Sequence, residues 1–278
     1  MIDEGRARET YTHGHGEFMA RVLSRRTAAI DAGFLLPHLR PGAEVLDCGC
    51  GPGSITVGLA EAVAPGRTAG IDRSDGHFRV ALALAAKHGT DNAEFQVADV
   101  YQLPFDDGSF DAVFANGLLL HLSEPGHALR KMRRVLRPSG IVAIRDLDWD
   151  SWLIAPTTPL LEEFRALLRQ VMTSNGAGLQ YARHQRALLL EAGFARTEAS
   201  VTASCHVGGT YPGTAEATKQ WAKTYLWLLA DFTQQAVAAG WIDAAGLEAM
   251  AAEVQHWADR PDAFEAIVWC EALGWASV

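Results

Sequence analysis

The chain has 278 residues, enough for one large domain or one domain with a cap. Apolar residues make up 49% and charged residues 21%, which is typical of a globular protein. No apolar run reaches the roughly 18 residues of a membrane span, and the segment Met1–Arg6 lacks the apolar core of a signal peptide. The formal net charge is −9, and the basic runs are only pairs such as Arg25-Arg26, which argues against a phosphate-backbone binder. We therefore expect a cytoplasmic protein without a membrane or nucleic-acid partner.

The four cysteines, Cys48, Cys50, Cys205 and Cys270, indicate reduced thiols. Cys48 and Cys50 point to opposite faces of an extended segment, and no second pair of Cys or His follows at zinc-finger spacing. No metal site is expected.

Between residues 40 and 147, short apolar runs alternate with helical patterns, which is typical of repeated βα units and a parallel sheet. We expect strands at 43–47, 68–72, 94–98, 110–115 and 141–144, with helices at 54–64, 75–88 and 124–136. Ser54 is expected to cap the first of these helices. Leu82 is expected on the inner face of the second, together with Phe78, Ala81 and Ala85.

After residue 150 the pattern predicts helices at 159–172 and 181–192, a strand at 195–207, a helical segment at 215–257 and a last strand at 264–269. The expected fold class is α/β, with a doubly wound, mostly parallel sheet of seven strands. Three parts are expected: an N-terminal helical lid (1–38), an α/β core (39–150), and a C-terminal part (151–278) with a helical cap insertion and the last two strands.

The segment Val45–Gly53 predicts a strand that runs into a glycine-rich turn and then a helix. Glycines there let the backbone approach a ligand, and a helix N-terminus favours an anionic group. In open α/β sheets, ligands lie beyond the carboxyl ends of the strands. The dinucleotide pattern would require glycine at position 54, where this chain has Ser54, so the turn predicts a different ligand.

Polar residues follow the next three strands. Asp72 ends the second strand, where a carboxylate can accept both hydroxyls of a ribose. Asp99 and Val100 follow the third, where a side-chain acceptor and a backbone N–H can read an adenine edge. Asn116 ends the fourth. Together with the glycine turn, these strand ends indicate a nucleoside-containing cofactor.

With these features, the stretch 40–147 resembles the class I S-adenosylmethionine-dependent methyltransferases, and among them the ubiquinone and menaquinone C-methyltransferases. The matching segments are Leu46–Gly53, Gly70–Asp72, Ala98–Val100, Leu103–Asp111 and Val135–Gly140. Together the stretch covers roughly two-fifths of the chain. In a looser way, Tyr11–Gly16 and Arg145–Asp148 resemble a bacterial secondary-metabolite subgroup of that branch.

The resemblance implies S-adenosylmethionine as the cofactor. It places Gly49 and Gly51 against the methionine part, Asp72 on the ribose, and Asp99 with Val100 on the adenine. Asn116 would hold the amino group through its backbone, and Asp47 and Arg73 complete the expected cofactor-binding set.

Methyl transfer needs little covalent help, because a sulfonium methyl is already activated and the enzyme mainly aligns the acceptor and excludes water. His121, five residues after Asn116, is the candidate base, with a helix cap as its alternative role. Tyr11 and His15 lie in a glycine-flanked segment that could close as a lid over the acceptor. The alternative for this segment is a frayed tail.

The sequence therefore predicts methyl transfer to a small-molecule acceptor at O, N or C, in secondary or quinone-like metabolism. The alternatives are a cyclase of the same fold, or a protein that binds the cofactor without transferring its methyl. An NAD-dependent oxidoreductase is disfavoured by Ser54. The acceptor and the oligomeric state, a homo-oligomer included, are left open.

Overall fold

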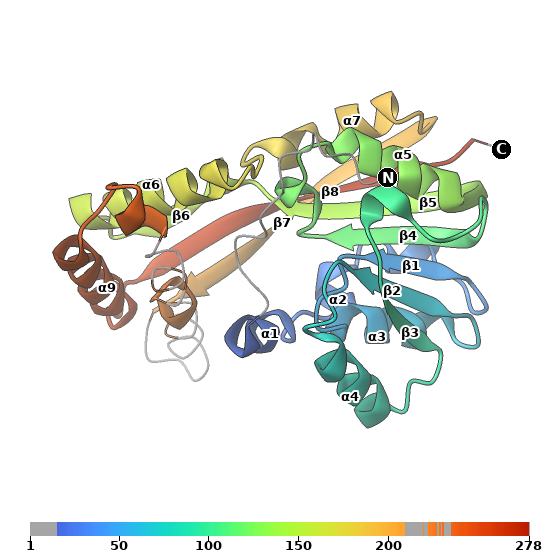
Figure 1. The fold of residues 1–278 in the computed structure, drawn as a ribbon, viewed down its shortest axis with the longest axis horizontal. Helices are drawn as coiled ribbons and strands as arrows, with labels where there is room; N and C mark the ends of the chain where they lie inside the picture. The colour runs from blue at the N-terminus through green and yellow to red at the C-terminus, as the bar shows by residue number, and fades with distance from the viewer. Residues whose placement is uncertain are drawn as a thin grey trace.

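The computed structural model describes residues 16–208, 219, 222–226, 228, 230 and 235–277. Its centre is a parallel sheet in the order β3-β2-β1-β4-β5. The strands are β1 (Val45–Cys48), β2 (Thr68–Asp72), β3 (Ala93–Val97), β4 (Phe110–Asn116) and β5 (Leu136–Leu147). After β3 the chain crosses to the other side of β1, where β4 pairs with it in parallel. The carboxyl ends of β1 and β4 therefore lie side by side (Figure 1).

The last strand, β8 (Phe264–Trp275), pairs antiparallel with β5, and β7 (Arg196–Val207) pairs along the other edge of β8. Pairing with β5 uses only Trp269–Trp275, so the first half of β8 leaves an edge that β6 (Leu153–Ala155) fills. The sheet thus has eight strands in the described part of the chain, and the expected number of seven is wrong. The long β7/β8 ribbon reaches from the core to the helices at the far end (Figure 1).

Helices cover both faces of the sheet, which confirms the doubly wound α/β fold. One face packs against α2 (Ala28–Asp31) and α3 (Ser54–Val63), and the other against α5 (Pro125–Val135) and α7 (Gln185–Glu191). The inward residues of α5 are those that the periodicity predicts: Ala128, Leu129, Met132 and Val135.

Two local expectations are wrong. The N-cap of α3 is Gly53, and the hydroxyl of Ser54 instead donates to the carbonyl of Leu23 at 3.2 Å, which ties the helix to the N-terminal segment. In α4 (Phe78–His88), Ala81 is buried but Leu82 is 58% exposed. The helix packs on a narrow stripe of small residues, and Leu82 lies a further 100° round the helix.

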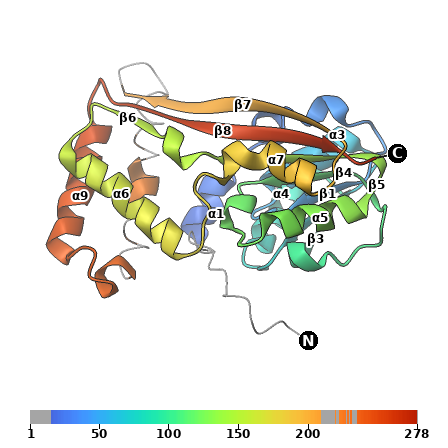
Figure 2. The same ribbon diagram turned by 90° about the horizontal axis from the view of Figure 1, so that it is seen from above.

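Further helices precede and follow the parallel strands in the chain. They are α1 (Glu17–Leu23), η1 (Leu36–His38), α6 (Pro159–Ser174) and α9 (Ala244–Ala258), and the predicted helix at 181–192 is split into η5 (Tyr181–His184) and α7. At the far end of the ribbon, α6 and α9 share a separate core around Trp152, Phe164 and Trp257, and α1 lies between this core and the parallel sheet (Figure 2). None of the described helices is long and apolar enough to cross a membrane.

Candidate active site

The turn after β1 is built from glycines with positive φ: 74° at Gly49, 49° at Gly51 and 74° at Gly53. The amides of Gly49 and Cys50 both donate to the carbonyl of Ile71 on β2, at 2.8 and 2.9 Å. A Cβ at Gly53 would lie 2.7 Å from Ala81, whereas one at Gly51 would meet nothing closer than 3.9 Å. The backbone at Gly51 therefore borders open space.

Asp72, at the end of β2, closes this turn from the other side. Its Oδ2 accepts the Gly51 amide at 3.0 Å, and its Oδ1 accepts the Ser74 amide at 3.2 Å. A carboxylate oxygen can accept more than one hydrogen bond, so both oxygens keep capacity for a diol such as a ribose.

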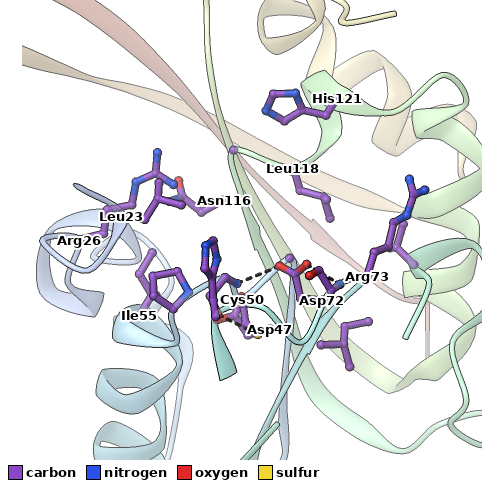
Figure 3. A pocket seen from close by; sticks show the side chains of 18 of the residues that line it. Leu23, Arg26, Asp47, Cys50, Ile55, Asp72, Arg73, Asn116, Leu118 and His121 are labelled. Atoms are coloured by element: carbon purple, nitrogen blue, oxygen red, sulfur yellow. Dashed lines mark hydrogen bonds between the residues drawn. The ribbon is translucent and has the colours of Figure 1, made fainter. Parts of the chain in front are cut away.

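A cavity of about 560 Å³ opens between these elements, within the range of small-molecule sites (Figure 3). Figure 3 shows Asp47, Cys50 and Asp72 at the base, with His121 above them and Arg26 and Arg73 on opposite sides. Eight of the residues expected from sequence line it: Asp47, Gly49, Gly51, Asp72, Arg73, Val100, Asn116 and His121.

Asp99 does not line the cavity, and its expected contact with the adenine stays a prediction. Its carboxylate accepts the Tyr101 amide at 2.9 Å and caps the short helix η2 (Val100–Gln102). Ala98 and Val100, on either side of it, line the cavity. A carboxylate oxygen can accept more than one hydrogen bond, so this cap leaves capacity for a ligand donor.

Asp47 is buried beneath the turn, and its carboxylate accepts the Thr56 hydroxyl at 2.6 Å. Burial, with a smaller contribution from the nearby Asp72 charge, raises the pKa of Asp47 to about 7. Near neutral pH this carboxyl therefore exchanges a proton, and a cationic ligand beside it would favour the ionised form.

His121 lies on η3 (Leu119–His121), just after β4. It borders both the first cavity and a second, smaller one of about 120 Å³. Four residues border both cavities: Leu23, Arg26, Gly117 and His121. We call the first the cofactor cavity and the second the acceptor cavity.

Asp146 on β5 supports η3 from behind. It is fully buried, its Oδ1 accepts the Leu120 amide at 3.4 Å, and its Oδ2 accepts from the Gln185 side chain at 3.3 Å. Burial raises the pKa of Asp146 to about 7. The carboxyl thus positions the turn that carries His121.

Arg145 is a residue whose role in the site the sequence analysis did not predict. It is 3% exposed, with Nη1 2.9 Å from Asp31 Oδ1 and 3.3 Å from Asn116 Oδ1, and with Nε 3.3 Å from Glu271 Oε1. Its guanidinium also stacks 4.1 Å from the ring centre of Trp269. It therefore joins α2, the cofactor cavity and β8. The available signal was the charged pair Arg145-Asp146 directly after the apolar run Ile141–Ile144.

The N-terminal segment enters the site through α1 and the turn after it, because Leu23 and Arg26 border both cavities. Tyr11 and His15, expected above the acceptor, lie outside the described residues. Their placement stays a prediction.

The strand order, the glycine turn and the strand-end carboxylate together define a Rossmann-like protein with a nucleoside-type cofactor site. The family model described as a methyltransferase domain matches residues 39–225 of this chain. The chain belongs to this methyltransferase family, and its cofactor is S-adenosylmethionine, as the sequence predicts. The glycine cradle and the open capacity of Asp72 fit that cofactor.

Individual similarities agree with this. The chain is 34% identical over 167 residues to 27-O-demethylrifamycin SV methyltransferase of Amycolatopsis mediterranei, covering 59% of this chain and 58% of that protein. The chain spans about half the length of the curated relatives it matches.

Two solved structures share the fold. Phosphoethanolamine N-methyltransferase 2 of Haemonchus contortus, in complex with S-adenosylmethionine, superposes with a TM-score of 0.56 at 15% identity, over 97% of this chain and 59% of that one. The cyclase SpnF gives a TM-score of 0.50 at 23% identity, over 94% and 80% of the two chains.

Proposed function

We propose that this protein transfers the methyl group of S-adenosylmethionine to a small-molecule acceptor. The carrying observation is that the cofactor cavity and the acceptor cavity meet at Gly117 and His121. When bound, the cofactor supplies a sulfonium methyl that is already activated. The chain's own task is then to hold the acceptor in line with that methyl and to keep water away.

The described residues suit this task. Asp72 and the turn at Gly51 would bind the ribose and methionine parts, and Val100 would lie against the adenine. Leu23 and Arg26 lie over the junction, so we propose the segment around α1 as a lid. We assign the lid, the α/β core and the C-terminal part to residues 1–38, 39–150 and 151–278.

His121 is the proposed base for an acceptor that must lose a proton, because it borders both cavities and histidine is the most common general base in enzymes. Tyr11 and His15 are proposed for the opposite wall on sequence grounds alone. The relative named for 27-O-demethylrifamycin SV supports an acceptor from secondary metabolism.

The test is incubation of the protein with isotope-labelled S-adenosylmethionine and a panel of aromatic and polyketide-like acceptors, followed by mass spectrometry. A labelled product one methyl group heavier, absent with the Asp72→Ala variant, supports the proposal. An isomerised product that carries no label would show a cyclase instead. Cofactor binding without any product across a broad panel would count against methyl transfer to this acceptor class.

A further inference from the structure

The acceptor cavity is walled on one side by a single face of the β7/β8 ribbon. Side chains at alternate positions of a strand share a face, which places Glu265, Ile267 and Trp269 of β8 together. The register sets His206 opposite Glu265 and Ser204 opposite Ile267 on β7. All five border the acceptor cavity, and we call them the acceptor stripe.

This stripe begins beside the cofactor cavity and runs away from it. Asn116 pairs with Arg145 on β5, and Arg145 pairs with Glu271 on β8. Glu265 lies six residues further along the same strand, about 20 Å at 3.3 Å per residue. Glu265 therefore marks the end of the acceptor cavity that is remote from the methyl-transfer point.

Glu265 is 3% exposed, and its carboxylate is only partly satisfied. Its Oε1 accepts the hydroxyl of Tyr225. Its Oε2 accepts no hydrogen bond from the described residues, and Nδ1 of His206 lies 3.6 Å away. A buried acceptor atom without a donor is costly, so a ligand that brings a donor would be favoured there.

The other walls are largely apolar and include two tryptophans. Trp149 and Trp152 are nearly fully buried and contact each other edge to face, with ring centres 6.1 Å apart. Both border the acceptor cavity, as does Trp269 on the stripe. Walls of this kind favour a flat or polycyclic apolar body.

We infer that the acceptor is an elongated molecule with an aromatic or polycyclic body. The end of this molecule remote from the methylated atom carries a hydrogen-bond donor, and Oε2 of Glu265 accepts that hydrogen bond. The donor is a hydroxyl or a protonated amine. This inference rests on the proposed function, because it takes the second cavity as the acceptor site. Glu265 is a binding residue in this arrangement and takes no part in the transfer itself.

The test is calorimetric titration with three matched probes: naphthol, naphthylmethylamine and methoxynaphthalene, which has no donor. S-adenosylhomocysteine is bound beforehand to fill the cofactor cavity, so that each probe can bind only in the acceptor cavity. At least one donor probe should bind about fivefold more tightly than methoxynaphthalene. A preference for naphthol would identify the donor on the acceptor as a hydroxyl. A preference for naphthylmethylamine would identify it as a protonated amine.

Glu265→Gln is the diagnostic variant. With Tyr225 still donating to the amide oxygen, the new NH₂ takes the place of Oε2 and cannot accept a hydrogen bond, so the preference for a donor probe should disappear. Glu198→Gln, at an exposed position of the same ribbon, should keep the preference. Calorimetry with S-adenosylhomocysteine alone checks that each variant is folded.

Equal binding of all three probes, a preference that survives in Glu265→Gln, or no probe binding at all would overturn the inference. Any of these results with S-adenosylhomocysteine affinity intact leaves methyl transfer standing. If the unaltered protein does not bind S-adenosylhomocysteine, that result would count against the proposed function instead.

Discussion

The backbone amide of Gly51 donates a 3.0 Å hydrogen bond to Oδ2 of Asp72. This bond joins the turn after β1 to the end of β2, two segments that are 21 residues apart. It fixes the carboxylate at the rim of the cofactor cavity before any ligand arrives, so binding requires little ordering of this side chain.

Replacement of Asp72 by Ala should weaken S-adenosylmethionine at least about tenfold, because hydrogen bonds to a charged group contribute on the order of 1.5–3 kcal/mol each. Titration calorimetry measures the change. Asp75→Ala, at an exposed position three residues further on, should bind like the unaltered protein. Equal affinity of the two variants would show that Asp72 does not contact the cofactor.

Gly51→Ala and Gly53→Ala should fail in different ways. At Gly51 the φ of 49° strains a side chain by about 1–2 kcal/mol, and its Cβ would enter the cofactor cavity, so cofactor affinity should fall while the fold persists. At Gly53 a Cβ would also collide with Ala81 and Phe95, so stability should fall further. Thermal unfolding and calorimetry on both variants make the comparison. A Gly51→Ala protein with full affinity would place the ligand elsewhere.

Asp146→Asn should change how stability depends on pH. The pKa of Asp146 is raised from 3.8 to about 7 in the folded protein, so its contribution to stability is present below about pH 4 and is lost as pH rises through 7. Relative to the Asn variant, the unaltered protein should lose up to about 4 kcal/mol between pH 4 and pH 7 and then level off.

The replacement should be tolerated structurally. The amide of Gln185 can turn so that its Oε1, which has no hydrogen bond with the described residues, accepts from the new Asn NH₂. Urea unfolding at pH 5, 6, 7 and 8 tests the difference. A stability gap that stays constant over this range would contradict a titrating Asp146.

Arg145→Ala should destabilise the protein by about 3–5 kcal/mol, because it leaves Asp31 and Glu271 charged, buried and without their cation. Cofactor affinity should fall as well, since Arg145 also holds the side chain of Asn116. Arg260→Ala removes a surface ion pair with Asp262 and should leave the unfolding free energy nearly unchanged. Similar losses in both variants would refute a special role for the buried network.

His121→Gln should lower kcat by about 100-fold or more if the imidazole removes a proton from the acceptor. Cofactor affinity should stay within a few-fold of the unaltered protein, because Asp72 and the glycine turn are untouched. Steady-state kinetics on the acceptor found in the mass-spectrometric screen measure the effect. A loss confined to KM would make His121 a positioning residue.

The sequence predicts the cofactor side well, because strand ends of parallel βα units must share one edge of the sheet. Asp72 and Asn116 could be placed there from the order of the elements alone. Asp99 also follows a strand, but its carboxylate caps a short helix and does not line the cavity, so its contact with the cofactor stays a prediction. The strand β6 has three residues and pairs with the part of β8 that extends beyond β5. A strand this short has no local sequence pattern from which it could be predicted.

The acceptor side depends on partners that are far apart in the chain. Glu265 faces a residue of β7 and the hydroxyl of Tyr225, 40 positions earlier. Arg145 meets Asp31 across 114 positions and Glu271 across 126. Such pairs follow from tertiary packing, which periodicity does not encode, and for this reason the charged residues of β5 and β8 had no readable role in the sequence.

The continuity of β8 has an evolutionary consequence. One uninterrupted strand carries Glu271, beside the cofactor cavity, and Glu265, at the remote end of the acceptor cavity. Substitutions at positions 265 and 267 would change what the cavity accepts, while residues nearer the sheet centre keep the ribbon in register. Descendants of this chain could therefore acquire new substrates stepwise, with the methyl donor site inherited unchanged.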